Sequence, residues 1–247
     1  MPSLTAGGLV ALGLVGLYIF VRYELRIDNP VVDLDLFRHN TVFAFSNLAA
    51  LVNYAATFAV TFMLSIYLQK IKGLNPQEAG IVLIVQPIVQ AILSPMAGRL
   101  SDRVEPRTVA SVGMALTFVG LVSLVFLDSE SSIHYILAVL ALLGVGFALF
   151  SSPNTNAIMS AVERRYFGVA GALVSAMRQI GMMVSMGIVM LILALLLGQA
   201  EIEPAYYGAF VNSMKIAFVV FAVLCFGGIF ASLARGRVKP NARQPER

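Results

Sequence analysis

The chain has no tryptophan, only one cysteine and few charged residues, and these scarcities exclude several kinds of protein. The single cysteine, Cys225, excludes an intrachain disulfide bond. Only 12% of the 247 residues are charged, whereas 59% are hydrophobic and the mean hydropathy is +0.85. Such a composition excludes a soluble core covered by a polar surface and indicates a membrane protein.

Motifs of enzymes and of cofactor sites are also absent from the sequence. It contains no nucleotide-binding P-loop, no cluster of metal ligands and no pairing of a nucleophile with a base. Its two histidines, His39 and His134, are isolated at the edges of apolar runs. We therefore predict no enzymatic activity, no catalytic residue, no cofactor and no metal site.

Seven apolar runs are long enough to cross the ~30 Å hydrocarbon layer of a membrane as helices. The runs are Leu4–Val21, Val42–Tyr67, Ala79–Ala97, Val109–Leu127, Ile133–Val162, Val169–Leu197 and Ala209–Leu233. All 13 acidic residues fall in the connections, at the ends of runs or in the tail. No carboxylate is therefore expected at membrane depth to carry a proton. The expected fold is an all-α membrane protein with seven transmembrane helices.

Lysine and arginine are distributed unequally between the two sides of this seven-helix map. Thirteen of the 17 fall on one side, and only Lys70 and Lys72 fall on the other. Basic connections are retained in the cytoplasm, so we predict a multi-pass protein of the cell membrane with its N-terminus outside and its C-terminus inside. The last six helices then form two triplets, Val42–Leu127 and Ile133–Leu233, that begin on opposite sides. We expect these triplets to be inverted three-helix repeats of one bundle.

The domain boundaries follow the longest polar connection. We expect residues 1–40 to form a linker transmembrane helix and a cytoplasmic connection, 41–234 a six-helix bundle, and 235–247 a basic cytoplasmic tail. The tail is interpreted as an anchor for anionic lipid headgroups, with no role in nucleic-acid binding.

The stretch SPMAGRLSDRVEPRTVASVG, residues 94–113, places a charged turn between two apolar runs. Gly98 offers a small surface where the ends of the two helices approach, and Pro106 suits the first position of the second helix. Asp102 can accept hydrogen bonds from a helix N-terminus, while Arg103 and Arg107 can pair with Asp102 or with lipid phosphate. A simpler interpretation is a basic turn that only retains this side in the cytoplasm.

The residues Gly98, Asp102, Arg103 and Arg107 resemble the cytoplasmic loop of the major facilitator superfamily, G-x-x-x-D-R-x-G-x-R in outline, with Glu105 at the place of the second glycine. NPVVDLDLFRHNTVF resembles the linker entering the C-terminal six helices of the fourteen-helix drug:proton antiporters. SSPNTNAIMSAVERRYFGVAGALVSAMRQIG resembles the fourth and fifth helices of the same half.

This resemblance implies the C-terminal half of a polyspecific exporter of amphipathic or cationic compounds, coupled to proton entry by alternating access. It also implies that this chain lacks the preceding six-helix half. The expected partners are the lipid bilayer, a separate N-terminal six-helix half or a second copy of the chain. We expect the chain to be inactive without such a partner.

Two stripes of neutral polar side chains follow the second and third apolar runs, each with residues spaced four apart on one helix face. Their members are Asn53, Thr57 and Thr61 on one run and Gln86, Gln90 and Ser94 on the next. Polar groups are costly against lipid, so these faces either form interhelical hydrogen bonds or line a substrate cavity. For the cavity we select Asn53, Thr57, Gln86 and Gln90.

Two basic residues and two asparagines are further polar residues inside the runs. Arg178 lies about ten residues, or ~15 Å, from the cytoplasmic end of its run, so we also place it at the cavity or against a partner. The alternative is that its side chain extends along the helix to the headgroups. Lys215 is closer to the outer end and is expected to extend toward the headgroups. Asn154 and Asn156 follow Pro153, where we expect structural hydrogen bonds.

Two other function classes fit parts of this pattern. Seven helices with a lysine in the last one also describe a retinal-binding protein, but the chain lacks a buried counter-ion carboxylate and any tryptophan. A membrane scaffold or regulatory half-protein, which binds other helices without transport, remains as the second hypothesis.

Overall fold

The computed structural model describes residues 2–24, 26, 40–198 and 202–234, which are helical apart from short connections. Two compact units divide the chain, Met1–Asn40 and Thr41–Arg247. The first unit contains helix α1 (Pro2–Glu24). The second contains α3 (Thr41–Ile66), η1 (Tyr67–Ile71), α4 (Pro76–Leu83), α5 (Val85–Arg103), α6 (Pro106–Val125), α7 (Ile133–Ser160), η2 (Arg164–Tyr166), α8 (Phe167–Leu196), η3 (Pro204–Tyr206) and α9 (Tyr207–Ala234). The predicted charged connection at 27–39 and the basic tail at 235–247 lie outside the described residues.

Within the described part of the chain, six helical segments are long and apolar enough to cross a membrane. They are Thr41–Ile71, Pro76–Arg103, Pro106–Val125, Ile133–Ser160, Arg164–Leu196 and Pro204–Ala234. These segments match the last six predicted runs, so the prediction of an all-α chain with several membrane-spanning helices is confirmed at this level. The first predicted run lies within α1, and its crossing of the membrane stays a prediction.

One predicted helix, Ala79–Ala97, is instead two helices that meet at Ile84. Pro87 lies in the first turn of α5 and has no backbone N–H. The carbonyl of Leu83, four residues earlier, therefore receives no helical hydrogen bond from it, and the helix is interrupted there. The segment also begins earlier than predicted, because Asn75 caps the N-terminus of α4 with its side chain.

Glycines allow α7 to contact α6 and α5 backbone to backbone. A Cβ added to Gly113 would lie 2.6 Å from the amide nitrogen of Phe150, and one added to Gly146 would lie 2.9 Å from the Gly113 carbonyl oxygen. On the α5 side of α7, a Cβ on Gly144 would lie 2.7 Å from the carbonyl oxygen of Gln86. Helices in lipid gain no hydrophobic free energy from associating with each other. Small residues at such crossings permit the close van der Waals packing that stabilises the association instead.

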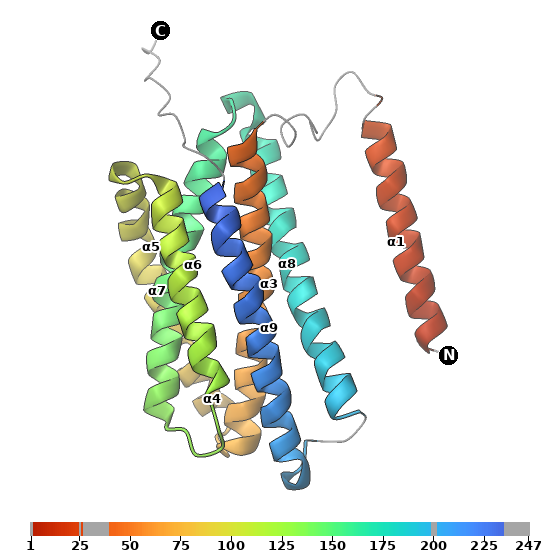
Figure 1. Cartoon of the computed structure of the whole chain (residues 1–247), viewed down its shortest axis with the longest axis vertical. Helices are drawn as coiled ribbons and strands as arrows, with labels where there is room; N and C mark the ends of the chain where they lie inside the picture. The colour runs from red at the N-terminus through yellow and green to blue at the C-terminus, as the bar shows by residue number, and fades with distance from the viewer. Residues whose placement is uncertain (1, 25, 27–39, 199–201, 235–247) are drawn as a thin grey trace. The chain divides into compact units, whose positions relative to one another are not determined.

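The helices of the Thr41–Ala234 region run side by side (Figure 1). The first group of three spanning segments contains α3, α5 and α6, the second contains α7, α8 and α9, and helices of one group pack against helices of the other. Helix α5 packs chiefly against α7, and α8 packs chiefly against α3. Helices α6 and α9 contact each other and also pack on α7 and α3, respectively. The second helix of each group therefore lies against the first helix of the other group.

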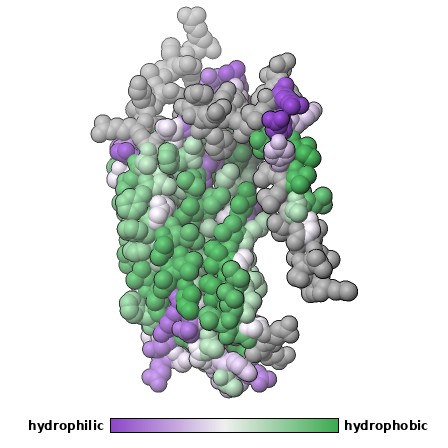
Figure 2. Space-filling model, turned by 45° about the vertical axis from the view of Figure 1, so that its right-hand side comes forward, coloured by the Kyte–Doolittle hydropathy of each residue, from purple (hydrophilic) through white to green (hydrophobic). Residues whose placement is uncertain are grey.

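Helices α5 and α8 have the least buried surfaces of the bundle. Only 11% of the apolar stretch in Pro76–Arg103 and 17% of that in Arg164–Leu196 is buried, against 61% for Thr41–Ile71. Apolar side chains cover most of the visible face of this unit between hydrophilic ends (Figure 2). The sides of α5 and α8 that face away from α7 and α3 are thus available to lipid or to another protein surface.

Hydrogen bonds join α7 to α3 and to α5 near the end of the bundle where α5 connects to α6. The Asn154 amide nitrogen donates to the carbonyl oxygen of Ser46 at 3.1 Å, and the Asn156 amide nitrogen donates to the hydroxyl oxygen of Ser101 at 3.0 Å. Both asparagines of α7 therefore have the structural role predicted for them. The acceptors are hydroxyl and backbone groups of α5 and α3.

Candidate functional site

A buried tyrosine on α3 contacts a half-buried arginine on α8 and a buried phenylalanine on α7. The guanidinium carbon of Arg178 on α8 lies 5.0 Å from the ring centroid of Tyr54 on α3. The other partner of Tyr54 is Phe147 on α7, whose ring meets it edge to face with centroids 5.3 Å apart. A cation over an aromatic face is stabilised by the ring quadrupole, by about 2 kcal/mol where water is excluded.

The close approach of α8 to α3 places Arg178 over this ring. Gly181, one turn after Arg178, would bring an added Cβ within 2.6 Å of the Leu51 carbonyl oxygen and 2.9 Å of the Tyr54 Cβ. One further turn along, the Ser185 hydroxyl oxygen accepts a hydrogen bond from the Ala59 backbone N–H at 3.0 Å. This face of α8, marked by Gly181 and Ser185, is therefore fixed against α3.

Unpaired polar atoms accompany the arginine. The Nε of Arg178 is buried without a hydrogen-bond partner among the described residues, and so are both amide atoms of Asn53. Asn53 is fully buried on α3, next to Tyr54 in the chain. A buried polar group without a partner costs about 1–3 kcal/mol, so such groups usually bond to protein, water or a ligand. Asn53 on α3 and Arg178 on α8 thus each keep buried polar atoms that could bond to a water or a ligand.

The remaining cavity candidates differ in how closely they join this group. Thr57 is buried one turn after Asn53, and its hydroxyl donates to the Asn53 carbonyl oxygen at 2.8 Å. Gln86 and Gln90 are half-buried on α5, which packs against α7. No interaction among the described residues connects either glutamine with Arg178. Asn53 and Thr57 are therefore joined only within α3, and Arg178 contacts their neighbour Tyr54. No interaction among the described residues joins Asn53 or Thr57 with Arg178, so the shared cavity stays a prediction.

The third members of the two stripes are also placed differently. Thr61 is exposed, so the predicted inward face of the first stripe ends at Thr57. Ser94 is half-buried, and its hydroxyl donates to the Gln90 carbonyl oxygen of its own helix at 2.7 Å. Tyr54 and Phe147 could not be predicted as site residues, because an aromatic residue within an apolar run has the same sequence pattern as a residue of the hydrophobic core.

The charged turn connects α5 and α6, and Pro106 occupies the first position of α6 as predicted. Gly98 faces α7 instead of α6, with the Ser152 hydroxyl oxygen 3.1 Å from an added Cβ. This corrects the expected role of Gly98, because α5 packs against α7 and only weakly against its chain neighbour α6. Arg107 contacts Glu105 at 3.4 Å and donates to the Leu233 carbonyl oxygen of α9 at 3.5 Å.

Asp102 and Arg103 lie in the last turn of α5, and both are exposed. Asp102 makes no ion pair or hydrogen bond with another described residue, so the predicted pairing with arginine is not formed in this structure. It lines a polar hollow of about 310 Å³ that also reaches Phe167, the first residue of α8. Asp102 is thus near a helix N-terminus without bonding to it.

Every acidic residue described between 41 and 234 lies at a helix end or in a connection. These residues are Glu78, Asp102, Glu105, Asp128, Glu130, Glu163 and Glu203. The described residues also contain no group of three or more histidine, cysteine, aspartate or glutamate side chains able to hold a metal ion. The site around Tyr54 thus consists of aromatic, amide and guanidinium groups.

The sequence model described as the Major Facilitator Superfamily matches residues 47–247 of the chain. The chain is 27% identical over 225 residues to the riboflavin transporter RibZ of Clostridioides difficile, covering 90% of this chain and 49% of that protein. It is 32% identical over 190 residues to the multidrug resistance protein Stp of Mycobacterium tuberculosis, covering 77% and 35%. It is 28% identical over 169 residues to the methyl viologen resistance protein SmvA of Salmonella typhimurium, covering 68% and 34%. The chain thus spans about half or less of the length of these relatives.

Proposed function

This chain belongs to the Major Facilitator Superfamily, and from that premise we propose that it supplies the C-terminal bundle of a proton-coupled multidrug efflux transporter of the fourteen-helix antiporter type. Members of the superfamily are transporters, so the prediction that the chain is not an enzyme is confirmed. Family membership and six membrane-spanning helices also make it a multi-pass membrane protein. The finer points, namely efflux, proton coupling and the antiporter type, are our proposal.

The observation that carries the proposal is the position of Arg178 over Tyr54. The preceding residue of α3, Asn53, has a buried amide without a hydrogen-bond partner among the described residues. A binding site for amphipathic molecules combines aromatic surface with a few convergent polar groups. Tyr54 and Phe147 supply the aromatic surface, and Asn53 and Arg178 supply the polar groups. Thr57 continues the polar face of Asn53 on α3. Gln86 and Gln90 lie on another helix, α5, which packs chiefly against α7.

We assign amphipathic or cationic small molecules as the substrate class. Relatives named for riboflavin transport, multidrug resistance and methyl viologen resistance support a site that accepts ring-containing or amphipathic compounds. A cationic substrate would be repelled by Arg178 unless its charge lay near an acid or an aromatic face. Arg178 already lies over the Tyr54 ring, so we propose that Phe147 supplies the aromatic face for such a charge.

Transport by alternating access needs two bundles that rock around a site between them. The exchange of helix partners between the two groups of three supports our proposal that residues 41–234 form one such bundle of inverted repeats. The poorly buried helices α5 and α8 support a second bundle as their partner, on the same polypeptide or on another one. Asp102, with Gly98, Arg103 and Arg107, is proposed to change partners as the bundles rock.

No described acid lies at membrane depth, so a proton-carrying carboxylate must come from the second bundle. Two copies of this chain would supply a second set of helices but no such carboxylate among the described residues. We therefore propose that the 247-residue chain alone does not carry out proton-coupled efflux.

Reconstitution tests this proposal. The purified chain is placed in liposomes with an imposed pH gradient and a fluorescent cationic dye, with or without a co-expressed N-terminal six-helix half. Gradient-driven dye movement is expected only with the added half, and Arg178→Ala in the paired sample should reduce it. Dye movement by the chain alone would refute the proposal. Co-purification of the two halves without any dye movement would favour the scaffold hypothesis.

A further inference from the structure

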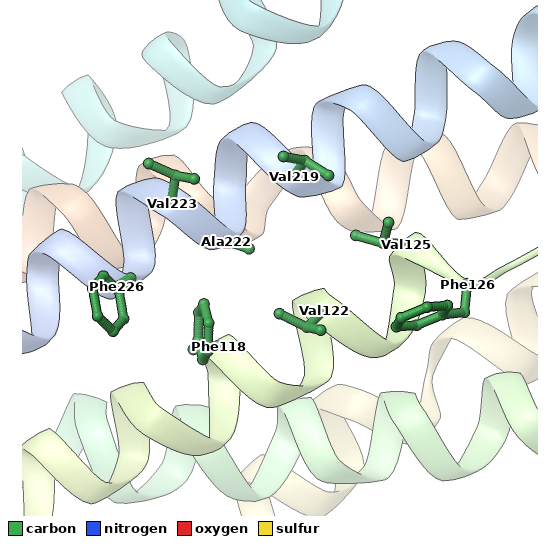
Figure 3. Close-up of a pocket in the computed structure, with 8 residues that line it drawn as sticks. All are labelled: Phe118, Val122, Val125, Phe126, Val219, Ala222, Val223 and Phe226. Atoms are coloured by element: carbon green, nitrogen blue, oxygen red, sulfur yellow. The ribbon is translucent and has the colours of Figure 1, made fainter.

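An apolar groove of about 380 Å³ runs between α6 and α9. Its lining consists of Phe118, Val122, Val125, Phe126, Val219, Ala222, Val223 and Phe226. Four of these residues lie on α6 or at its C-terminal end and four lie on α9, and Figure 3 shows Phe118 and Phe226 in the space between the two helices. Phe126 is 71% exposed and Val223 is 65% exposed, so the groove is open to the surroundings of the bundle.

The two ends of the groove differ. At one end, the rings of Phe118 and Phe226 approach with centroids 5.5 Å apart, and Phe226 also meets Phe230 edge to face. At the other end, Phe126 caps the C-terminus of α6 and leads into the connection to α7. The groove is therefore bounded by aromatic rings at the first end and by a polar connection at the second.

A lysine lies beyond the second end. Lys215 precedes Val219 by one turn of α9, and the spacing of 215, 219, 222 and 226 places these residues on one face of the helix. The Ser131 hydroxyl and the Glu130 amide hydrogen-bond the Asp128 carboxylate and lower its pKa, and the Lys215 charge lowers it further. The Lys215 charge therefore acts on the connection that follows Phe126, where the exposed Asp128 carboxylate also lies.

The depth of this lysine follows from the length of α6. Its 20 residues extend ~30 Å, the thickness of the hydrocarbon layer. The connection after α6, and Lys215 near it, therefore lie at the depth of the lipid headgroups. From Lys215 to Phe226, α9 rises ~16 Å, which is close to the ~15 Å hydrocarbon depth of one leaflet.

We propose that this groove binds one anionic phospholipid of the leaflet on the Lys215 side, with an acyl chain between α6 and α9 and the phosphate against the Lys215 ammonium. The charge of Lys215 complements the phosphate, and the entirely apolar lining complements the acyl chain. A transmembrane helix of a second copy is the competing occupant, and the quenching test below separates it from an acyl chain.

The absence of tryptophan makes this proposal testable by fluorescence. Phe226→Trp places a single tryptophan in the groove, and Phe230→Trp, one turn away and outside the lining, is the matched control. Each variant of the 247-residue chain is reconstituted in phosphatidylcholine vesicles with increasing amounts of phosphatidylglycerol that carries bromine on its acyl chains. Bromine quenches tryptophan only on contact, so the titration gives the local preference for the anionic lipid.

One lysine at the membrane surface should favour the anionic lipid by about fivefold at position 226. We expect that preference to fall to about one with Lys215→Ala, to persist with Lys215→Arg and to be absent at position 230. Equal preferences at 226 and 230, or no effect of Lys215→Ala, would overturn the proposal. Failure of any brominated lipid to quench at 226 would show that protein covers the groove and would also overturn it.

A second measurement needs no tryptophan. Native mass spectrometry of the unmodified chain should detect retained phosphatidylglycerol, with at least a severalfold loss in Lys215→Ala and retention in Lys215→Arg. Equal retention in all three proteins would contradict a phosphate contact at Lys215.

Discussion

The contact between α8 and α3 depends on Gly181, and its replacement by alanine is our principal test of the site. The added Cβ would lie 2.6 Å from the Leu51 carbonyl oxygen and 2.9 Å from the Tyr54 Cβ. Normal contacts between such atoms need about 3.5 Å, so α8 would have to move away by roughly 0.5–1 Å. Because Tyr54 is the residue under Arg178, the same movement should disturb the site.

Overpacking of this kind costs about 1–3 kcal/mol, which for a unit of about 200 residues lowers Tm by roughly 2–10 °C. Gly187→Ala is the matched control, because it lies on the same helix and an added Cβ there meets no atom within 4 Å. Alanine favours helix more than glycine does, so Gly187→Ala should leave Tm unchanged or raise it slightly.

The single cysteine provides the assay. Cys225 is fully buried, so a maleimide dye that fluoresces on reaction with thiols should report its exposure during heating in detergent. Gly181→Ala should react at a clearly lower temperature than the parent chain, and Gly187→Ala should not. Identical unfolding temperatures for the two variants would refute the close packing of α8 on α3 and the placement of Arg178 that depends on it.

Three further predictions concern the site and the charged turn. Tyr54→Leu and Arg178→Met should be non-additive in the same thermal assay, with a coupling of about 1–2 kcal/mol, whereas additive losses would argue against the cation–π contact. In an active two-bundle transporter, Asp102→Asn should lower the transport rate more than the expression level, and an unchanged rate would leave Asp102 only the role of a cytoplasmic turn residue. With Cys225→Ser as background, Val104→Cys should be labelled by an impermeant maleimide only after cells are opened, because Val104 is 42% exposed in the turn predicted to be cytoplasmic. Gln77→Cys, exposed at the other end of the bundle, should react from outside intact cells, and the reverse labelling pattern would invert the topology.

The sequence by itself determined the class of structure and the positions of the spanning helices. Apolar runs of sufficient length can only be helices when they cross a membrane alone, because every backbone group needs a partner within the segment. A charge is costly in hydrocarbon, so acids outside the apolar runs were expected at helix ends and connections, where the structure has those that it describes. Helix breaks were less visible, since Pro87 fits the first turn of a helix as well as an interruption.

Only the tertiary structure decided which residues meet. The stripes on the second and third runs looked equivalent in sequence, yet α3 packs against α8 and places Tyr54 under Arg178, while α5, which carries Gln86 and Gln90, packs against α7. Helices in lipid choose partners through the fit of small residues such as Gly181, and those partners are often distant in the chain. For the same reason Gly98 contacts α7 and not the neighbouring helix α6, because a helix periodicity defines a face but not the surface that it meets.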